Sequence, residues 1–489
     1  MAKAIPRLII AGTHSGVGKT TLTLGLLAAL RNRGLRVQPF KVGPDFIDPG
    51  HHTAVTGLAS HNLDSWMLKR ETLGRIFEQY ITGADLALIE GVMGLFDGYD
   101  GKTERGSTAE VAKLLEAPVV LVMDASSMAR SAAAIIHGFE HFDPDLRVAG
   151  MVFNHVAGPK HFAYLREAVE QNCRTEVLGY VSRDAGLTLP ERHLGLVMAQ
   201  EGVLPAEWLD RLAAVIEEHI SMERFLDITQ EGRCRSSLSS KELVRIAAQK
   251  LRFLSNDTAP ISEAPSSPPR RGPLVRVGIA RDQAFCFYYQ YNLDLLRSLG
   301  AELVPFSPLK DPGLPLGVQG LYLGGGYPEL HAAALAANVS MRKALRAFAE
   351  KGGPIYAECG GFMALTREIV DLEGSSHPMV GLFPTRAVMG RRLRALGYVE
   401  VEMNRDSPLG RAGERARGHE FRYSQIDPLP PEVPRTYRLF KSYQGTEPAD
   451  LSGEGYVYKN CLGSYVHLHF GSNGEWARRW LELCASWDR

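Results

Sequence analysis

The chain lacks several features that mark special classes of protein. It has no apolar run of about 18 residues, the length that a helix needs to cross a bilayer. Its first residues, MAKAIPRLII, lack an apolar segment followed by a small-residue cleavage site. Its six cysteines are scattered without CxxC or metal-like spacing. We therefore expect a cytoplasmic protein with reduced thiols and no membrane partner.

The chain also lacks an excess of charge of either sign. Lys and Arg together number 55, and so do Asp and Glu, so bulk charge does not favour a nucleic acid as a partner. Hydrophobic residues make up 45% and charged residues 22%, as in ordinary globular proteins. With 489 residues, the chain is long enough for two or three domains that each have a core.

Strands and helices are predicted to alternate along both halves of the chain. Continuous apolar runs in the first half suit strands of a parallel sheet that is buried on both faces; they lie at 86–91, 117–125 and 147–156. A second α/β pattern follows a Ser/Pro-rich stretch and ends in a β-rich tail from about residue 398. We predict an α/β fold with two doubly wound domains. The predicted parts are 1–222, a helix and linker over 223–273, and 274–489.

The segment GTHSGVGKTT, residues 12–21, follows an apolar run and precedes an expected helix. A strand, a glycine-rich turn and a helix form a P-loop, whose backbone N–H groups bind phosphate oxygens. The loop has the longer GxxxxxGKT spacing. Lys19 would reach the β- and γ-phosphates, and Thr20 would offer its hydroxyl to Mg²⁺. Asn154, after another expected strand, either reads a base edge or forms a turn. The predicted nucleotide-binding residues are Gly16, Gly18, Lys19, Thr20, Thr21 and Asn154.

Charged residues follow two further expected strands of the first half. Lys41, Asp45 and Asp48 come with and after QPFKV, whereas Glu90 ends LALIEG and Asp97 lies on the next loop. Because the carboxyl ends of parallel strands meet at one edge, we expect these side chains near the P-loop. Mg²⁺ takes such oxygen ligands, and Glu90 is the best candidate, since a charge that ends so apolar a strand needs a partner. A solvated loop carboxylate or a helix cap explains any single acid equally well.

In the second half, GPIYAECGGFMAL has the form of a nucleophile elbow, with Cys359 at the turn between a strand and a helix. A thiol at a helix N-terminus has a lowered pKa, which favours the nucleophilic thiolate. The Gly360 N–H could be one oxyanion donor, and the glycine loop 324–326, with Gly325 at its centre, could supply another. The alternative is a buried, inert cysteine.

A cysteine nucleophile needs a base from another segment, and SYVHLHF offers two histidines. His467 is the leading candidate, and His469 is the second. Residues two apart face the same side of a strand, so the spacing predicts that both rings point the same way. Only one of them need be catalytic.

Eight segments, in this order, resemble the cobyrinic acid a,c-diamide synthase family, in which an amide-forming ATPase domain is fused to a class I glutamine amidotransferase domain. They are GTHSGVGKTT, KVGPDFIDP, EGVMGLFDG, ARDQAFCFYYQYNLDLL, LGGGYPEL, AECGGFMAL, GHEFRYS and SYVHLHF. The resemblance covers essentially the whole chain. The first half also looks like dethiobiotin synthetase, which shares the lengthened P-loop and activates a carboxylate with ATP.

The resemblance implies a two-site enzyme that uses ATP, Mg²⁺, glutamine and a tetrapyrrole carboxylate. Cys359 and His467 would release ammonia from glutamine. In the other domain the carboxylate would attack the γ-phosphate of ATP, and ammonia would convert the acyl phosphate to an amide. The implied metal residues are Thr20, Asp45 and Glu90, and the implied substrate-carboxylate residues are Lys41, Asp48 and Asp97. A homodimer is left open.

The chain departs from broader expectations in two places, the lengthened P-loop and the residue that follows the catalytic histidine. Many class I amidotransferases carry a Glu two residues after the catalytic histidine, but His469 stands there. The nucleophile would then work as a dyad or borrow a distant acid. The aromatic run over residues 285–289 suits either stacking on a macrocycle or core packing.

Two alternatives to amidation of cobyrinic acid stay open. The first is the same chemistry on hydrogenobyrinate, nickel sirohydrochlorin or sirohaem. The second is a partitioning-type regulatory ATPase. Against the second stand the acid-rich KVGPDFIDP loop, the lack of a terminal amphipathic membrane helix, and a Cys/His domain that a nucleotide switch would not need.

Overall fold

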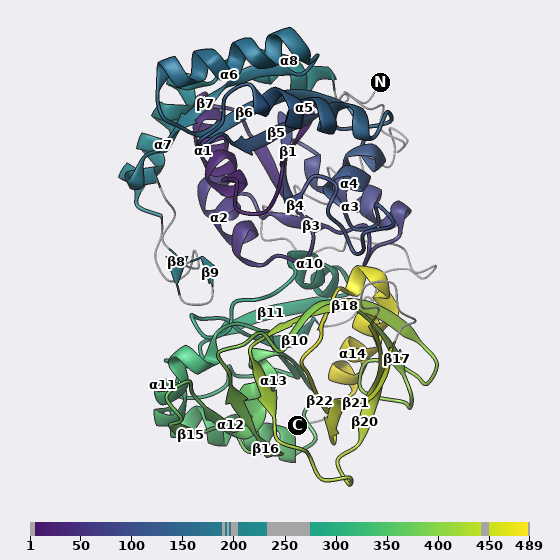
Figure 1. Ribbon diagram of the computed structural model, residues 1–489. Coiled ribbons are helices and arrows are strands. Elements are labelled where there is room, and N and C mark those ends of the chain that lie inside the picture. Colours follow the sequence, from purple (N-terminus) through teal and green to yellow (C-terminus); the bar gives the residue numbers. More distant parts are fainter. Residues whose placement is uncertain are drawn as a thin grey trace. The chain divides into compact units, whose positions relative to one another are not determined.

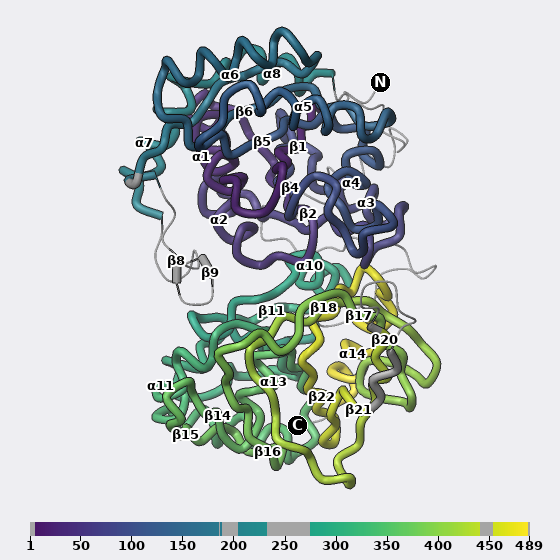
Figure 2. The backbone as a smooth tube through the Cα atoms, viewed as in Figure 1, coloured from purple at the N-terminus to yellow at the C-terminus, as the bar shows by residue number. Residues whose placement is uncertain are grey.

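The computed structural model describes residues 5–187, 191–192, 195–196, 204–231, 274–441 and 449–487 (Figures 1 and 2). The chain separates into two compact units, Met1–Lys250 and Leu251–Arg489. Most of the predicted linker lies outside the described residues, so the boundaries at 222/223 and 273/274 stay predictions. Across the described ranges, no helix is both long enough and apolar enough to cross a membrane.

The N-terminal unit is built on a seven-stranded, wholly parallel sheet in the order β3-β2-β4-β1-β5-β6-β7. Its strands are β1 Arg7–Gly12, β2 Val37–Val42, β3 His61–Leu63, β4 Leu86–Gly94, β5 Val119–Asp124, β6 Val148–Val156 and β7 Glu176–Ser182. A separate pair is β8 Glu191–Arg192 and β9 Gly195–Leu196. The apolar runs become strands as predicted, because a parallel sheet between helices is buried on both faces.

Helices cover both faces of this sheet (Figure 1). They are α1 Lys19–Asn32, α2 Ile47–Thr56, α3 Arg70–Ile81, α4 Thr108–Leu114, α5 Ser131–Phe142, α6 Pro159–Asn172, the turn η1 Ala185–Leu187, α7 Ala206–His219 and α8 Met222–Glu231. Apolar side chains of α1, α7 and α8 form one core with β1 and β4. Because β1 lies between β4 and β5, the P-loop that follows β1 opens at the point where the strand order reverses.

The C-terminal unit holds a ten-stranded mixed sheet in the order β11-β10-β12-β13-β22-β21-β20-β17-β18-β23. Its members are β10 Val275–Ala280, β11 Ala301–Phe306, β12 Gly320–Leu323, β13 Ile355–Glu358, β17 Ala395–Met403, β18 Arg415–Arg422, β20 Arg435–Lys441, β21 Ala449–Tyr458, β22 Cys461–Ser464 and β23 His467–Leu468. The five strands from β11 to β22 pair in parallel, and the rest pair antiparallel. The parallel part and the β-rich tail were both predicted.

A four-stranded sheet in this unit was not predicted. It contains β14 Thr366–Val370, β15 Ser376–Pro378, β16 Phe383–Met389 and β19 Ser424–Ile426. These strands are short and partly exposed, so they carry little apolar periodicity. The helical elements of the unit are α10 Gln290–Ser298, η2 Pro328–His331, α11 Ala332–Ala337, α12 Val339–Glu350, α13 Gly360–Leu365, η3 Phe470–Ser472 and α14 Gly474–Ser486.

The path from β22 to β23 joins distant parts of the larger sheet. β22 pairs with β13, the strand that ends at Glu358, directly before Cys359. After two residues the chain enters β23, which pairs with β18 and sets His467 opposite His419. This connection sets His467 against β18, while the N–H of the next residue, Leu468, donates to Glu358 at the end of β13.

The packing of α1 against α7 gives a stability prediction. A Cβ built on Gly25 in α1 would lie 2.7 Å from Ile216 Cγ1 and 2.9 Å from Leu212 Cγ. Helix propensity favours Ala over Gly by about 1 kcal/mol, but overpacking a core costs about 1–3 kcal/mol. We expect Gly25→Ala to lower the free energy of unfolding of this unit by up to about 2 kcal/mol in chemical denaturation.

The matched control is Gly74→Ala in α3, where a Cβ would meet nothing within 4 Å. Only the propensity term acts there, so this variant should be more stable than the parent chain by up to about 1 kcal/mol. Equal stabilisation by both substitutions would contradict the close packing of α1 on α7.

Candidate functional site

The P-loop joins the end of β1 to the first turn of α1. Gly18 has a φ of 92°, and Lys19 begins the helix. The Lys19 ammonium donates to the backbone oxygens of Met93 (2.6 Å) and His14 (3.4 Å). Burial and the charge of Lys41 lower the pKa of Lys19 to about 8. The structure thus brings five of the predicted nucleotide residues into one turn: Gly16, Gly18, Lys19, Thr20 and Thr21.

Lys41 is the cation at the centre of the carboxylates near this loop. Its buried ammonium donates to Asp48 Oδ2, to Glu90 Oε1 at 2.9 Å and to the Gly91 carbonyl at 3.1 Å. Asp45 Oδ2 lies 3.8 Å away. The predicted gathering of charged residues at the carboxyl edge of β2 and β4 is therefore present.

Glu90 links this cation to the P-loop. The Thr20 hydroxyl donates to Glu90 Oε1 at 2.7 Å, and its distance to Asp48 Oδ2 is 3.4 Å. His52 Nε2 lies 2.7 Å from Glu90 Oε2, and His52 Nδ1 lies 3.3 Å from Ser60 Oγ. Glu90 is fully buried, so each carboxylate oxygen needs these donors.

The three buried charges perturb one another. Burial alone would raise the pKa of Glu90, but the charge of Lys41 and the hydrogen bond from His52 hold it below its usual value. Burial alone would lower the pKa of Lys41, but Asp48, Glu90 and Asp45 raise it. Burial, Asp45 and Glu90 raise the pKa of Asp48 well above its usual value. Lys41 therefore stays protonated, and the carboxylates around it outnumber the single positive charge that it supplies.

Two of the predicted carboxylates also organise the backbone. Asp45 Oδ1 accepts from the N–H groups of Ile47 (2.7 Å) and Asp48 (3.2 Å) at the start of α2. Asp97 is exposed and accepts from the Gly94 N–H at 2.9 Å. A helix cap and a solvated loop carboxylate were the alternatives that the sequence left open for these acids; Asp45 shows the first, and the exposed Asp97 shows the second.

The oxygens around Thr20 suit a magnesium ion shared with a nucleotide. Mg²⁺ is held by one or two carboxylates together with phosphates and waters rather than by a protein cage. Thr20 Oγ1 and Glu90 Oε1 lie 2.7 Å apart, and Asp45 Oδ2 lies 3.8 Å from the Lys41 ammonium that also contacts Glu90. Among the described residues no group of three or more His, Cys, Asp and Glu side chains could hold a metal alone.

Asn154 lies at the P-loop, but its amide faces the loop backbone. Its Nδ2 donates to the Val17 carbonyl at 2.9 Å, and a Cβ on Gly18 would lie 2.1 Å from the same nitrogen. Asn154 therefore holds the loop from β6. Recognition of a base edge by this residue stays a prediction.

Cys359 stands at a strained turn between β13 and α13. Its φ of 45° and ψ of −103° lie in a region that non-glycine residues rarely occupy, as at a nucleophile elbow. A Cβ on Gly361 would lie 2.2 Å from the Leu323 carbonyl, so only glycine permits the turn to pack against β12. Burial, followed by Glu329, raises the pKa of the Cys359 thiol to about 12. The expected lowering of this pKa is wrong for this structure because burial outweighs the helix N-terminus.

The glycine loop 324–326 packs against both the elbow and His467. A Cβ on Gly360 would lie 3.1 Å from the Gly326 nitrogen, and a Cβ on Gly325 would lie 2.4 Å from His467 Cε1. The Gly325 carbonyl accepts from the N–H groups of Cys286 (2.9 Å) and Phe287 (3.0 Å), which fixes the loop. The predicted elements of the thiol site therefore lie together.

The strand that was predicted to carry both histidines ends between them, so His467 lies in β23 and His469 lies beyond it. β23 ends at Leu468, because the Asn292 side chain donates to the Leu468 carbonyl (2.7 Å) and accepts from the Phe470 N–H (2.8 Å). His469 Nδ1 accepts from the Gly471 N–H and caps η3. Burial lowers the pKa of His467 to about 3, so its imidazole is neutral at rest.

Sequence reasoning missed two residues beside the predicted ones. His52 is bonded to Glu90, and Glu358 lies between β12, β13 and β23 with its Oε2 3.9 Å from His467 Nδ1. Glu358 ends the apolar strand IYAE just as Glu90 ends LALIE, so the rule applied to Glu90 could have found it. Burial raises the pKa of Glu358 to about 7.

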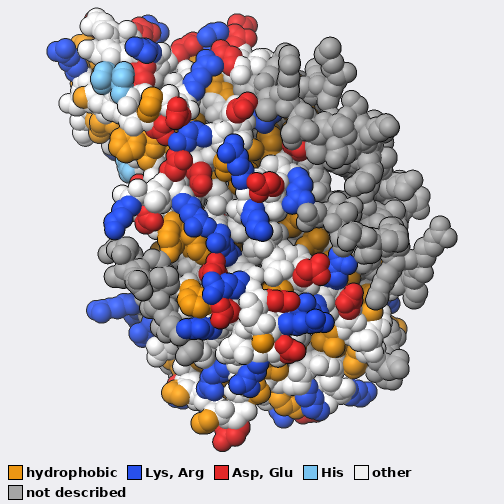
Figure 3. Space-filling view, turned by 90° about the vertical axis from the view of Figure 1, so that its right-hand side faces the viewer, with side chains coloured by type: hydrophobic (Ala, Val, Ile, Leu, Met, Phe, Trp, Pro, Cys, Tyr) orange, Lys and Arg blue, Asp and Glu red, His pale blue; other side chains and the backbone are white. Residues whose placement is uncertain are grey.

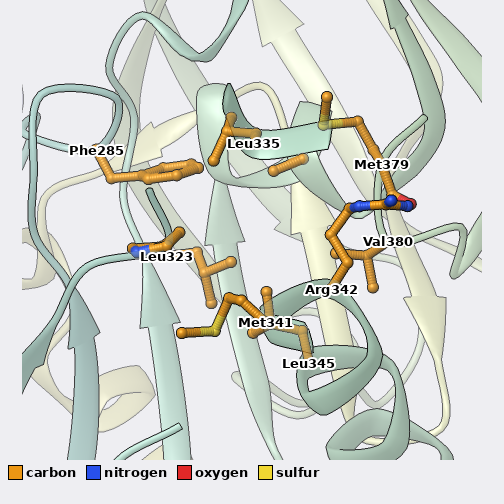
Figure 4. Close-up of a pocket in the computed structure, with 10 residues that line it drawn as sticks. Phe285, Leu323, Leu335, Met341, Arg342, Leu345, Met379 and Val380 are labelled. Carbon is orange, nitrogen blue, oxygen red and sulfur yellow. The ribbon is translucent and has the colours of Figure 1, made fainter. Parts of the chain in front are cut away.

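The aromatic run after β10 packs inside the C-terminal unit. Phe285, Phe287 and Tyr289 are buried, so the structure favours core packing over stacking on a macrocycle. Phe285 also lines an apolar pocket (Figure 4). The charged lining residue there is Arg342, whose guanidinium donates to the Ala336 and Met379 carbonyls. This pocket offers hydrophobic packing rather than groups for catalysis.

The thiols and surface charges agree with the composition. The five cysteines that the structure describes are free. On the face drawn in Figure 3, Lys and Arg side chains are interspersed with Asp and Glu side chains. That face therefore carries no large field of one sign.

Two family models match the chain. Residues 8–197 match a CobQ/CobB/MinD/ParA nucleotide binding domain, and residues 276–475 match a CobB/CobQ-like glutamine amidotransferase domain. The first match contains the P-loop and the Lys41 cluster, and the second contains Cys359 and His467.

Curated relatives match over nearly the whole length. The cobyrinate a,c-diamide synthase of Dehalococcoides mccartyi (strain ATCC BAA-2266) is 42% identical over 483 residues, which cover 98% of each chain. That of Salmonella typhimurium (strain LT2) is 42% identical over 482 residues, also 98% of each chain. That of Priestia megaterium is 41% identical over 478 residues, which cover 98% of this chain and 97% of the relative.

The charge cluster predicts a pH-dependent cost for Lys41→Met. Removing one partner of a buried ion pair costs about 3–5 kcal/mol, so at about pH 8 the local stability of β2 and β4 should fall by that order. The lowered pKa of Glu90 means that its stabilising contribution is present at neutral pH and is lost as the pH falls through that pKa. Without Lys41 the carboxylates take up protons at higher pH, so the deficit should shrink at about pH 5.

Hydrogen exchange of the β2 and β4 amides at the two pH values, corrected for intrinsic rates, measures this difference. Lys102→Met, which changes an exposed lysine of the same unit, should alter stability by less than about 0.5 kcal/mol at both. A deficit for Lys41→Met that stays constant with pH would contradict the assigned charges.

Proposed function

The chain belongs to the cobyrinate a,c-diamide synthase family, and on that premise we propose that it uses ATP and glutamine to convert the a and c carboxylates of cobyrinic acid to amides. The observation that carries the proposal is Cys359 at a φ of 45° against the glycine loop that His467 contacts. A regulatory ATPase has no use for such a thiol site. The membership makes the chain a glutamine-hydrolysing ligase of corrinoid biosynthesis.

The first half-reaction releases ammonia from glutamine. Cys359 Sγ attacks the side-chain amide carbon while its proton passes to His467. The N–H groups of Gly325 and Gly360 donate to the oxyanion. The C–N bond then breaks as His467 returns the proton to nitrogen, so ammonia leaves and a thioester remains. Water attacks this thioester with His467 as base and releases glutamate.

The second half-reaction uses ATP to activate a carboxylate of the substrate. A substrate oxygen attacks the γ-phosphate held at the P-loop, which gives ADP and an acyl phosphate. Ammonia then attacks the acyl carbon, loses a proton and expels inorganic phosphate. Lys19 stabilises the transferred phosphoryl group, and Lys41 orients the incoming carboxylate together with Asp48 and Asp97.

Magnesium binding also belongs to this proposal. When bound, Mg²⁺ would supply positive charge against the phosphate oxygens. Thr20 and Glu90 would hold it, with Asp45 at the margin of the site. Their support is the 2.7 Å contact between Thr20 Oγ1 and Glu90 Oε1, directly at the start of α1. A cytoplasmic location and a homodimer stay predictions.

The substrate is tested with a panel of tetrapyrroles. The protein is incubated with ATP, Mg²⁺, glutamine and each of cobyrinic acid, hydrogenobyrinate, nickel sirohydrochlorin and sirohaem, and amides are counted by mass. We expect two amides on cobyrinic acid, with glutamate and ADP formed together. ATP hydrolysis that needs neither glutamine nor tetrapyrrole would instead favour the regulatory ATPase.

Cys359→Ala separates the two half-reactions. It removes the nucleophile, so glutamine-dependent amidation should fall by on the order of 10³-fold or more, while amidation with added ammonium salt stays near that of the parent chain. The same mass assay measures both. Cys461→Ala is the matched control, because Cys461 is also a buried free thiol but lies in β22, away from the elbow. Loss of both activities in a folded Cys359→Ala protein would overturn this division of labour.

Glu90→Gln tests the ATP site from the other side. It keeps the shape of the side chain but removes the charge that Lys41, His52 and Thr20 contact. ATP-dependent amidation should fall by on the order of 10²-fold or more, whereas Cys359 should still react with a glutamine analogue. Glu71→Gln, an exposed site in α3, serves as control. Full ATP-dependent turnover in Glu90→Gln would remove Glu90 from the proposed site.

A further inference from the structure

We propose that Glu358 is the acid that positions His467 and balances its charge during glutamine hydrolysis. The inference rests on the proposed function of the Cys359 site and names a residue that the eight matching segments leave without a role. Glu358 touches neither substrate nor thiol in this assignment. It is a positioning residue that acts through the imidazole.

Glu358 is held in place from three strands. It ends β13, it is 1% exposed, and it directly precedes Cys359 in the chain. The Tyr356 hydroxyl and the Leu468 N–H donate to its Oε1, the latter at 3.0 Å. The Tyr322 hydroxyl donates to its Oε2 at 2.8 Å. These hydrogen bonds fix the orientation of the carboxylate before it interacts with a neighbouring side chain.

The partner is His467. Its Nδ1 lies 3.9 Å from Glu358 Oε2, and its ring packs on Gly325 through Cε1. An approach of about 1 Å would turn this contact into a hydrogen bond. Since Glu358 lies on the Nδ1 side of the ring, it favours the tautomer that leaves Nε2 free to take the thiol proton.

His469 cannot take this role, although it stands where many class I amidotransferases carry their glutamate. It is committed to the Gly471 N–H at the start of η3, and its ring stacks on Tyr291 at 5.5 Å. The acid therefore comes from the strand that ends at the nucleophile rather than from the strand that carries the base. Under this proposal the site is a Cys–His pair that is assisted by a third, acidic residue from β13.

The burial of Cys359 and His467 makes such an acid necessary. At rest both reacting groups are neutral, because burial raises the pKa of Cys359 to about 12 and lowers the pKa of His467 to about 3. Proton transfer would create an imidazolium where few waters solvate it, which costs free energy unless an opposite charge lies near. Glu358 supplies that charge when it is ionised. Burial raises the pKa of Glu358 to about 7, so its ionised fraction changes near neutrality.

The surroundings of Glu358 contain several other groups that titrate. His419 stacks on His467 at 5.1 Å, and burial, His467 and His469 lower its pKa. Burial raises the pKa of each tyrosine near Glu358, so all of them stay neutral at physiological pH: Tyr288, Tyr322, Tyr356 and Tyr437. Glu329 is another carboxyl whose pKa burial raises to about 7, but it acts on Cys359. Glu358 is the carboxyl beside His467, so its charge can change together with that of the imidazole.

The test is Glu358→Gln in the full-length protein, assayed for glutamine hydrolysis with ATP and cobyrinic acid present. Gln keeps the volume and one acceptor, but its amide cannot balance an imidazolium. We expect kcat to fall by on the order of 10²-fold with little change in KM for glutamine. The acid limb of the parent pH profile, at about pH 7, should vanish from the variant. Glu358→Asp should restore part of the rate.

Glu454→Gln is the matched control. Glu454 is another carboxylate whose pKa burial raises to about 7, and it accepts from Ser464 Oγ (2.6 Å) and the Tyr465 N–H (2.7 Å), close to the same segment. It should keep the acid limb and most of kcat. Ammonia-dependent amidation, unchanged in both variants, shows that the chain is folded.

Three outcomes would overturn the proposal. One is a Glu358→Gln profile that keeps the parent acid limb and rate, and another is an equal loss in both Gln variants. If Glu358→Gln also loses ammonia-dependent activity, Tyr322→Phe replaces it, since it removes the hydroxyl that donates to Glu358 Oε2 and keeps the carboxylate. No change in kcat or in the pH profile of that variant would be the third. A parent chain without glutaminase activity would instead overturn the proposed function together with this inference.

Discussion

A carboxylate at the end of a fully buried strand must have its charge compensated, and each half of this chain contains such a group. Glu90 ends the buried part of β4 among the donors Lys41, His52 and Thr20. Two of these donors can carry positive charge, so the pKa of Glu90 stays low despite burial. Glu358 ends β13 among hydroxyl and amide donors that carry no charge, so burial raises its pKa. Glu90 is therefore ionised at neutral pH, whereas the ionisation of Glu358 changes with pH near neutrality.

The difference between the two carboxylates matches the charge of the ligand that each site would bind. A nucleotide brings its own negative charge, so the N-terminal site must supply cations, and Lys19 and Lys41 lie there. Glutamine has a neutral side-chain amide, and the proposed thiol site matches it with neutral groups. In the proposed half-reaction the cost arises when proton transfer from Cys359 separates charge among buried groups. A carboxylate that ionises near neutrality is suited to that step.

Local patterns in the sequence predicted the parts of these sites that short segments build. The P-loop, the buried parallel strands and the elbow at Cys359 each depend on fewer than about fifteen consecutive residues, and each was predicted. Pairings between distant residues could not be read in the same way. The contact of Glu358 with His467 needs β22 to pass into β23, and the end of the strand between His467 and His469 involves Asn292, from α10. Asn154 shows a third limit, since a strand end was predicted but not that its amide would bond Val17.

The pKa of Cys359 shows where a local rule gives the wrong sign. A helix N-terminus stabilises a thiolate by a partial charge, but α13 has six residues and its dipole is correspondingly small. Full burial acts on the whole charge of the thiolate and therefore outweighs it. A resting thiol has a chemical advantage, because a permanent thiolate would be open to oxidation between turnovers. In the proposed half-reaction the nucleophilic thiolate forms only when His467 takes the proton from Cys359.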